Sequence, residues 1–127
     1  MNQDSLRQTV ERFNDCISKR DIERLATLMA QDHTFIDKVG NVVAGKEAVL
    51  KAWRGFFAAF PDYWNEFEHW EIDGSVVTVR GRSHCSNHRL DGPALWRALA
   101  CDDKISEWRV YDDTMENRNA LGMDPNS

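Results

Sequence analysis

One carboxylate lies where a carboxylate is poorly suited to its surroundings. Residues 33–45 read HTFIDKVGNVVAG, which predicts a β-hairpin whose turn is at Gly40 and Asn41. Asp37 falls in the first strand of this hairpin, directly after Ile36, although aspartate is a poor strand former. In an apolar pocket the pKa of such a carboxyl group would rise, which suits a general base. The alternatives are an exposed strand aspartate or one half of an ion pair.

Three charged residues further along the chain could act together with Asp37. Arg97 is a natural partner for a buried carboxylate, either as a clamp for an anion or carbonyl group or as a structural ion pair, or it could lie on the outer sheet face. His84 is a candidate acid or base partner of Asp37. Asp112 is a candidate second carboxylate at the mouth of a pocket. The orientation of the strand that carries His84 stays open. Its valines favour the core for their own face, which would turn His84 away from the core, whereas a bulge could reverse the parity along the strand.

Other kinds of site find little support. The formal net charge of −5 argues against nucleic acid as a partner, since phosphate binding needs a basic face. The four histidines and three cysteines show no metal-ligand spacing, so we expect no metal and no cofactor. No apolar run reaches the roughly 18 residues of a membrane helix. The first residues also lack the layout of a signal peptide, so a cytoplasmic protein without a membrane partner is expected.

The chain of 127 residues has the size of a single domain, spanning 1–127. Apolar spacing predicts a helix over 5–19 with a cap at Ser5, a short helix from Asp21, and a third helix over 46–60 ended by Pro61. Alternation and turn residues then predict strands over 64–72, 75–86, 93–101 and 105–112. Residues 115–127 are polar and predicted to be a loose tail. Helices followed by an antiparallel meander are typical of the α+β class, and a curved sheet around helices would enclose a small-ligand cavity.

Three stretches in this order resemble the nuclear transport factor 2-like superfamily, in its SnoaL-like and ketosteroid-isomerase-like branch. They read RDIERLATLMAQDHTFIDKVGNVVAGKEAV, GPALWRAL and ISEWRVYDD. The resemblance implies a cystatin-like α+β cone, in which a curved, mostly antiparallel sheet wraps three N-terminal helices. It also implies a homodimer packed through the outer sheet face, and a small apolar organic ligand.

The resemblance gives Asp37 a specific role. In the ketosteroid isomerases the strand after the second helix carries a catalytic aspartate, and IDKVG here matches that pattern. Two further positions depart from the isomerases. Phe13 stands where they have an oxyanion-donating tyrosine, and Leu95 where they have a protonated aspartate. Neither side chain donates a hydrogen bond, so ketosteroid isomerase activity itself is not expected.

Three functions therefore remain open from the sequence. The first is cofactor-free proton abstraction by Asp37 next to a carbonyl group, giving isomerisation, cyclisation or dehydration. The second is a non-catalytic ligand-binding or dimerisation module. The third is epoxide hydrolysis, for which Asp37, Arg97 and Asp112 supply the residue types. The side chains predicted to line the pocket are Phe13, Trp53, Phe57, Leu95, Trp108, Val110 and Asp112.

Overall fold

The computed structural model describes residues 2–101 and 103–123. Its elements follow in the order α1 (Gln3–Ser18), α2 (Ile22–Thr27), β1 (Met29–Ile36), β2 (Val42–Ala44), α3 (Lys46–Ala59), β3 (Trp64–Asp73), β4 (Val76–His84), β5 (Gly92–Cys101), β6 (Lys104–Asp112) and α4 (Met115–Ala120). The predicted α+β class, with helices first and a meander after them, is confirmed. Within the described residues no helix is long and apolar enough to cross a membrane.

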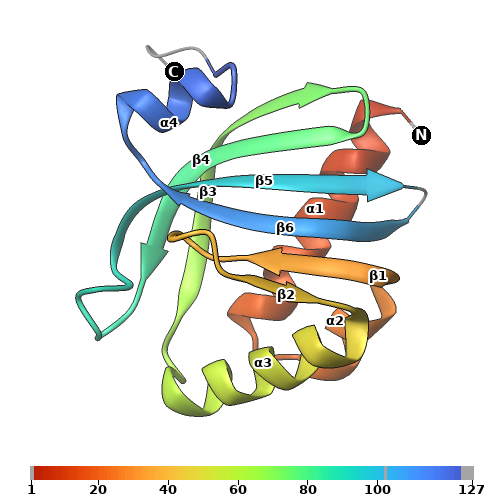
Figure 1. Cartoon of the computed structure of the whole chain (residues 1–127), viewed down its shortest axis with the longest axis vertical. Coiled ribbons are helices and arrows are strands. Elements are labelled where there is room, and N and C mark those ends of the chain that lie inside the picture. Colours follow the sequence, from red (N-terminus) through yellow and green to blue (C-terminus); the bar gives the residue numbers. More distant parts are fainter. Residues whose placement is uncertain (1, 102, 124–127) are drawn as a thin grey trace.

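All the strands belong to one curved six-stranded sheet with the order β2-β1-β6-β5-β4-β3 (Figure 1). Among the described strands, β1 and β6 pair in parallel and the other neighbours run antiparallel. Figure 1 shows α1 lying behind the sheet and α3 at the end formed by β1 and β2. The sheet therefore wraps one side of the helices.

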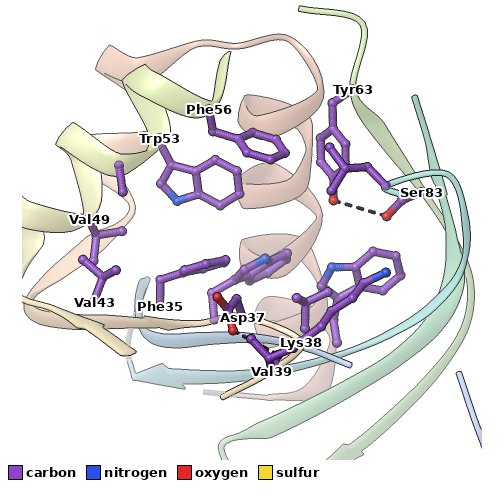
Figure 2. Close-up of a pocket in the computed structure, with 15 residues that line it drawn as sticks. Phe35, Asp37, Lys38, Val39, Val43, Val49, Trp53, Phe56, Tyr63 and Ser83 are labelled. Atoms are coloured by element: carbon purple, nitrogen blue, oxygen red, sulfur yellow. Dashed lines mark hydrogen bonds between the residues drawn. The ribbon is translucent and has the colours of Figure 1, made fainter. Parts of the chain in front are cut away.

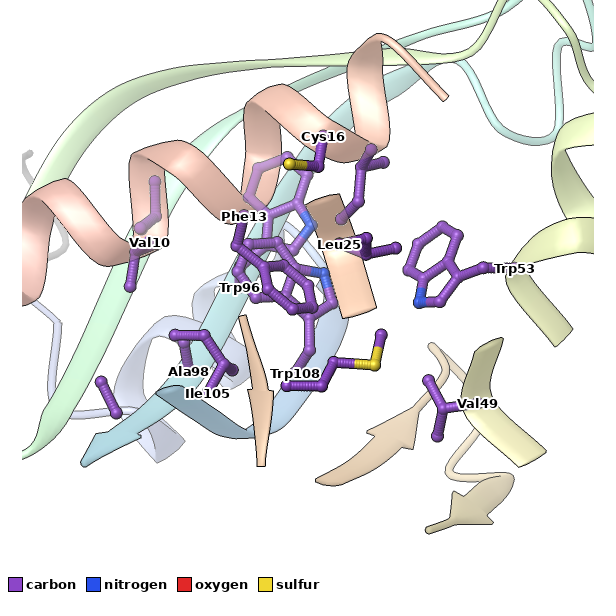
Figure 3. Close-up of a cluster of buried hydrophobic side chains, with 14 of the residues drawn as sticks. Val10, Phe13, Cys16, Leu25, Val49, Trp53, Trp96, Ala98, Ile105 and Trp108 are labelled. Carbon is purple, nitrogen blue, oxygen red and sulfur yellow. The ribbon is translucent and has the colours of Figure 1, made fainter. Parts of the chain in front are cut away.

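The first helix begins earlier than its sequence pattern predicted. The Asn2 side chain accepts a hydrogen bond of 2.8 Å from the Ser5 amide, so Asn2 and not Ser5 is the N-cap. The apolar stripe was predicted correctly, since Leu6, Val10 and Ile17 are all buried. Helix and strands share one hydrophobic core, in which the α1 stripe packs on Trp96, Ala98, Ile105 and Trp108 (Figure 3).

Strand register decides which face of β4 and β5 points toward this core. Val79 pairs with Trp96, which pairs in turn with Val110, and directly opposed residues share one face of a sheet. Val79 and Trp96 are fully buried in the core, so their face is the inner one. Leu95 has the other parity and lies on the outer face, opposite Arg80 on β4.

The last helix corrects the prediction of a loose tail. Thr114 caps α4 by accepting a hydrogen bond of 3.0 Å from the Asn117 amide. The Arg118 guanidinium binds the Asp113 carboxylate, which holds the pKa of that carboxyl group below its usual value. Met123 is only 4% exposed. The prediction of a loose tail is therefore wrong for residues 115–123, whereas residues 124–127 lie outside the described part of the chain.

Candidate functional site

A cavity of about 390 Å³ lies between α3, the β1–β2 hairpin and the inner face of the sheet (Figure 2). Its walls are mostly aliphatic and aromatic, and the lining side chains are Phe35, Asp37, Lys38, Val39, Val43, Val49, Ala52, Trp53, Phe56, Tyr63, Ser83, Leu90, Trp96, Trp108 and Val110. Volumes of roughly 300–1,000 Å³ with apolar walls and few polar groups are typical of small-molecule sites. This cavity is therefore the candidate functional site.

Contacts between aromatic rings reinforce two of its walls. On the sheet side, Trp108 packs on Phe13 of α1 with the ring centroids 4.6 Å apart. On the helix side, Trp53 meets Phe35 and Phe56 edge to face at 5.4 and 5.5 Å. Such ring pairs add about 0.5–1.5 kcal/mol each beyond their buried area, so the cavity is held open by its own packing.

Asp37 lines this cavity, but its carboxylate is occupied by the hairpin turn. Oδ1 accepts hydrogen bonds from the amides of Val39 (3.0 Å) and Asn41 (2.9 Å), and Oδ2 accepts one from the Asn41 side chain (3.0 Å). Burial would raise the pKa of Asp37, but these hydrogen bonds outweigh it and the pKa is lowered. The expected rise in pKa is therefore wrong. β1 also ends at Ile36, so Asp37 begins the turn and is not a strand residue.

Charged groups cluster near the turn. The Lys38 ammonium lies 3.2 Å from the Asp112 carboxylate, and Lys38 lines the cavity while Asp112 does not. Val39 at the hairpin tip is 82% exposed, which places the opening of the cavity beside this turn. Asp112 is thus near the mouth of the pocket as a partner of Lys38, and screening by solvent keeps such an exposed pair weak.

A polar network at the other end of the cavity was missed by sequence reasoning. The Tyr63 hydroxyl is 3.2 Å from Ser83 Oγ (Figure 2). Ser83 Oγ donates to Asn65 Oδ1 at 2.8 Å. Asn65 in turn donates to Asn14 Oδ1 at 3.1 Å. Polar residues at core-facing positions could have indicated this network, because Asn14 lies on the apolar stripe of α1 and Ser83 shares the inner parity of Val79.

Two of the predicted catalytic residues lie outside the cavity. Arg97 is on the outer face, opposite Arg109, and pairs with Glu107 instead of Asp37. His84 also has outer parity; its ring stacks on Trp64 at 4.2 Å, and its Nε2 is 3.0 Å from Glu66 Oε1. Neither side chain pairs with Asp37, because the positions of β4 and β5 that face the core are occupied mostly by apolar residues. The arrangement of Asp37, Arg97 and Asp112 around one water that epoxide hydrolysis would need is not formed.

The side chains predicted to line the pocket divide in the same way. Trp53, Trp108 and Val110 are on its walls. Phe13 lies behind Trp108, and Phe57 lies behind Trp53 at 5.4 Å, so both support the walls from the core. Leu95 is fully buried on the outer face of the sheet and does not line the cavity, so it was wrongly predicted as a pocket residue.

Comparison with known families settles the relationship of this chain. A family model described as the SnoaL-like domain matches residues 10–114. The chain belongs to the SnoaL-like domain family. No curated protein matches this SnoaL-like chain.

Solved structures share the fold of this SnoaL-like domain at low sequence identity. A candidate SnoaL-like polyketide cyclase from Shewanella putrefaciens is 20% identical, with a TM-score of 0.75 over 95% of this chain and 88% of that one. A candidate polyketide cyclase from Sinorhizobium meliloti is 21% identical, with a TM-score of 0.73 over 81% and 93%. A candidate ketosteroid isomerase from Kribbella flavida is 15% identical, with a TM-score of 0.71 over 87% and 79%. At these identities the similarity shows the cone fold and not the activity.

One of the buried titratable side chains of this SnoaL-like domain is a histidine on β1. His33 is fully buried, and its Nδ1 donates to the Ile105 carbonyl oxygen at 2.6 Å, which leaves Nε2 as the unprotonated nitrogen. Nε2 is buried and has no hydrogen-bond partner among the residues that the structure describes. Burial lowers the pKa of His33 from its ordinary value of 6.5, against the opposing effect of the bond to Ile105. The core therefore holds His33 as a neutral imidazole.

Acid should destabilise the fold through this residue. The unfolded chain takes up a proton near the ordinary pKa whereas the folded chain does not, so the free energy of unfolding should fall as the pH drops below about 6.5. His33→Asn should reduce this fall, whereas His88→Asn, at an exposed histidine, should leave it unchanged. Urea unfolding between about pH 7.5 and about pH 5 measures both. Equal pH dependence in wild type and His33→Asn would contradict the assignment.

Proposed function

We propose that this SnoaL-like protein binds a small, largely apolar organic molecule in the cavity between α3 and the sheet. The observation that carries the proposal is the cavity itself, with about 390 Å³ of space, aromatic walls and a polar end at Tyr63 and Ser83. Burying apolar ligand surface against such walls is favourable by roughly 25 cal/mol per Å² before the costs of association. Two of the structural relatives are described as a candidate polyketide cyclase and a candidate ketosteroid isomerase. The carbon skeletons of polyketides and steroids have this apolar character.

The cavity can be partly filled by a substitution on β6. Val110 is half-buried and lines the cavity from β6, so Val110→Phe should fill part of it while keeping a good strand residue. We expect naphthalene-based alcohols, ketones and hydrocarbons to raise the Tm of the wild type, and this rise to disappear in Val110→Phe. Val42→Phe is the matched control, because Val42 is 60% exposed on β2 and lies outside the cavity. Differential scanning fluorimetry measures all three proteins, and equal shifts in them would place binding elsewhere.

Catalysis by Asp37 is the second candidate, and its motive is that Asp37 lines the same cavity. The lowered pKa keeps the carboxylate ionised at neutral pH, so it can accept a proton from a carbon next to a bound carbonyl group. The reactions that follow are isomerisation, cyclisation or dehydration without a cofactor. The hydrogen bonds from Val39 and Asn41 make this carboxylate a weak base, so binding has the better support. A non-catalytic binding module remains the alternative to this candidate.

Asp37→Asn separates these two possibilities. If Asp37 is the base, the variant should retain the ligand-induced rise in Tm and lose turnover by about a hundredfold or more, since general-base catalysis contributes typically 10²–10⁴-fold. The assay follows solvent deuterium incorporation into each ligand found by fluorimetry. Unchanged exchange in Asp37→Asn would remove the catalytic candidate and leave binding alone.

The homodimer implied by the resemblance stays a prediction, which light scattering tests against the 14.7 kDa of one chain.

A further inference from the structure

The hydrogen bonds at the polar end of the cavity have a fixed direction. The starting point is the backbone carbonyl oxygen of Asn65, which can only accept, and Asn14 Nδ2 lies 3.1 Å from it. Asn14 must therefore present its amide nitrogen there, and its Oδ1 faces the side chain of Asn65. Asn65 then gives Nδ2 to Asn14 and is left with Oδ1 toward Ser83. The orientations of the Asn14 and Asn65 side-chain amides therefore both follow from the backbone carbonyl oxygen of Asn65, which can only accept.

The same logic fixes the two hydroxyl groups that line the cavity. Asn65 Oδ1 can only accept, so Ser83 uses its single proton in the 2.8 Å bond to it. Tyr63 Oη and Ser83 Oγ are 3.2 Å apart, and with the Ser83 proton engaged the Tyr63 hydroxyl is the donor of that bond. Tyr63, Asn65 and Ser83 are 8%, 5% and 2% exposed, so water does not compete strongly for these bonds.

The tyrosine keeps its proton at neutral pH. Burial raises the pKa of Tyr63, and the hydrogen bonds to Ser83 and Asn65 offset only part of this rise. The hydroxyl protons of Tyr63 and Ser83 are thus both used within the protein. The hydroxyl groups of Tyr63 and Ser83 have only oxygen lone pairs left for a molecule in the cavity.

We propose that this end of the cavity acts as a hydrogen-bond acceptor, and that Tyr63 and Ser83 select apolar ligands with a hydroxyl or N–H donor at their buried end. The inference rests on the proposed binding function and adds the polarity of the ligand to it. Ketones and ethers, which only accept, would place a lone pair against these oxygens. Phenols, enols and alcohols of the same shape would satisfy them.

Three ligands of one shape test the preference in the wild type. Naphthol carries a donor, acetylnaphthalene carries only an acceptor, and methylnaphthalene carries neither, at the same ring position. We expect naphthol to bind about three- to tenfold more tightly than the other two, the effect of one net hydrogen bond. Isothermal titration calorimetry measures the three dissociation constants. Equal affinities, or tighter binding of acetylnaphthalene, would overturn the inference while leaving the binding function intact.

Two variants locate the preference at this network. Ser83→Ala removes the acceptor of the Tyr63 proton, so Tyr63 can donate to a ligand and the preference should move toward acetylnaphthalene. Tyr63→Phe keeps the Ser83–Asn65 bond and removes one of the two acceptor oxygens. The difference in dissociation constant between naphthol and the other two ligands should therefore become smaller. Ser106→Ala is the matched control, because Ser106 is on β6 and bonds to the Leu99 carbonyl oxygen away from the cavity. Circular dichroism establishes that each variant is folded.

The outcomes separate the inference from the function that it deepens. Binding of none of the three ligands to any form would remove the proposed function together with the inference. Binding with an unchanged naphthol preference in both Ser83→Ala and Tyr63→Phe would keep the function and overturn the inference. The wild-type comparison needs no variant, so the inference can fail even if Ser83→Ala does not fold.

Discussion

Gly81→Ala is expected to destabilise the protein by about 3 kcal/mol or more, because overpacking against backbone cannot be relieved by a side-chain rotation. Gly81 on β4 pairs with Phe67 on β3, just before the register shift between Phe67 and His69. A Cβ atom at Gly81 would overlap the carbonyl oxygen of Glu66 and lie 3.0 Å from Phe67 Cα. The two strands approach so closely here that only glycine fits. Urea unfolding measures the effect as a shift in the free energy of unfolding.

A second glycine supplies the control for this prediction. Gly55 lies in α3, and a Cβ atom there would meet nothing within 4 Å. Gly55→Ala should stabilise the protein by about 0.5–1 kcal/mol, since alanine is the better helix former. A Gly81→Ala protein within about 1 kcal/mol of the wild type would show that β3 can move away from β4 at little cost. The position matters for the site, because Ser83 follows two residues later on the same strand.

Trp108→Ala is expected to cost about 3–5 kcal/mol, the range for removing a large aromatic side chain from a core. Trp108 is 1% exposed and packs between Phe13 at 4.6 Å and Phe67 at 6.2 Å. It also forms a wall of the ligand cavity, so its removal should join new space to the existing cavity. We therefore expect apolar ligands to restore part of the lost stability. Thermal unfolding with and without naphthalene ligands measures both effects.

Trp64→Ala is the matched control for Trp108→Ala. Trp64 is 44% exposed and stacks on His84 on the outer face, so its loss should cost about 1 kcal/mol or less. Similar losses at the two tryptophans would mean that the core around Trp108 collapses into the cavity after the substitution. Ligands would then no longer restore stability in Trp108→Ala.

Local patterns in the sequence were sufficient to predict most of the elements. The apolar stripe of α1 and the alternation in β4 each reflect one face turned toward the core, and that periodicity is written in consecutive residues. The hairpin at Gly40 and Asn41 was found from its turn residues. The prediction of a loose tail failed because α4 is short and polar and shows no apolar stripe. Contacts hold it in place: the cap at Thr114, the Asp113–Arg118 pair and the burial of Met123.

The candidate site was predicted less well, because its chemistry depends on faces and partners. Arg97 and Leu95 share one parity, as expected, but the sequence could not say that this parity is the outer one. Asp37 was found as a cavity residue, whereas its lowered pKa follows from the way the turn folds back on the carboxylate. Tyr63 was overlooked because it lies in the short connection between α3 and β3, where no periodicity marks its direction.

The sequence by itself determined the α+β order with apolar side chains inside, since hydrophobic spacing and turn residues act over short distances. The cone of the SnoaL-like kind was implied by the resemblance of its motifs to that family. The tertiary structure alone decided which charged residues meet and which hydroxyl group accepts. Those properties arise where segments distant in the sequence come together, as in the bond between Asn14 and Asn65, which are 51 residues apart. A hydrogen bond needs a donor and an acceptor within about 3 Å, and only the folded chain sets that distance.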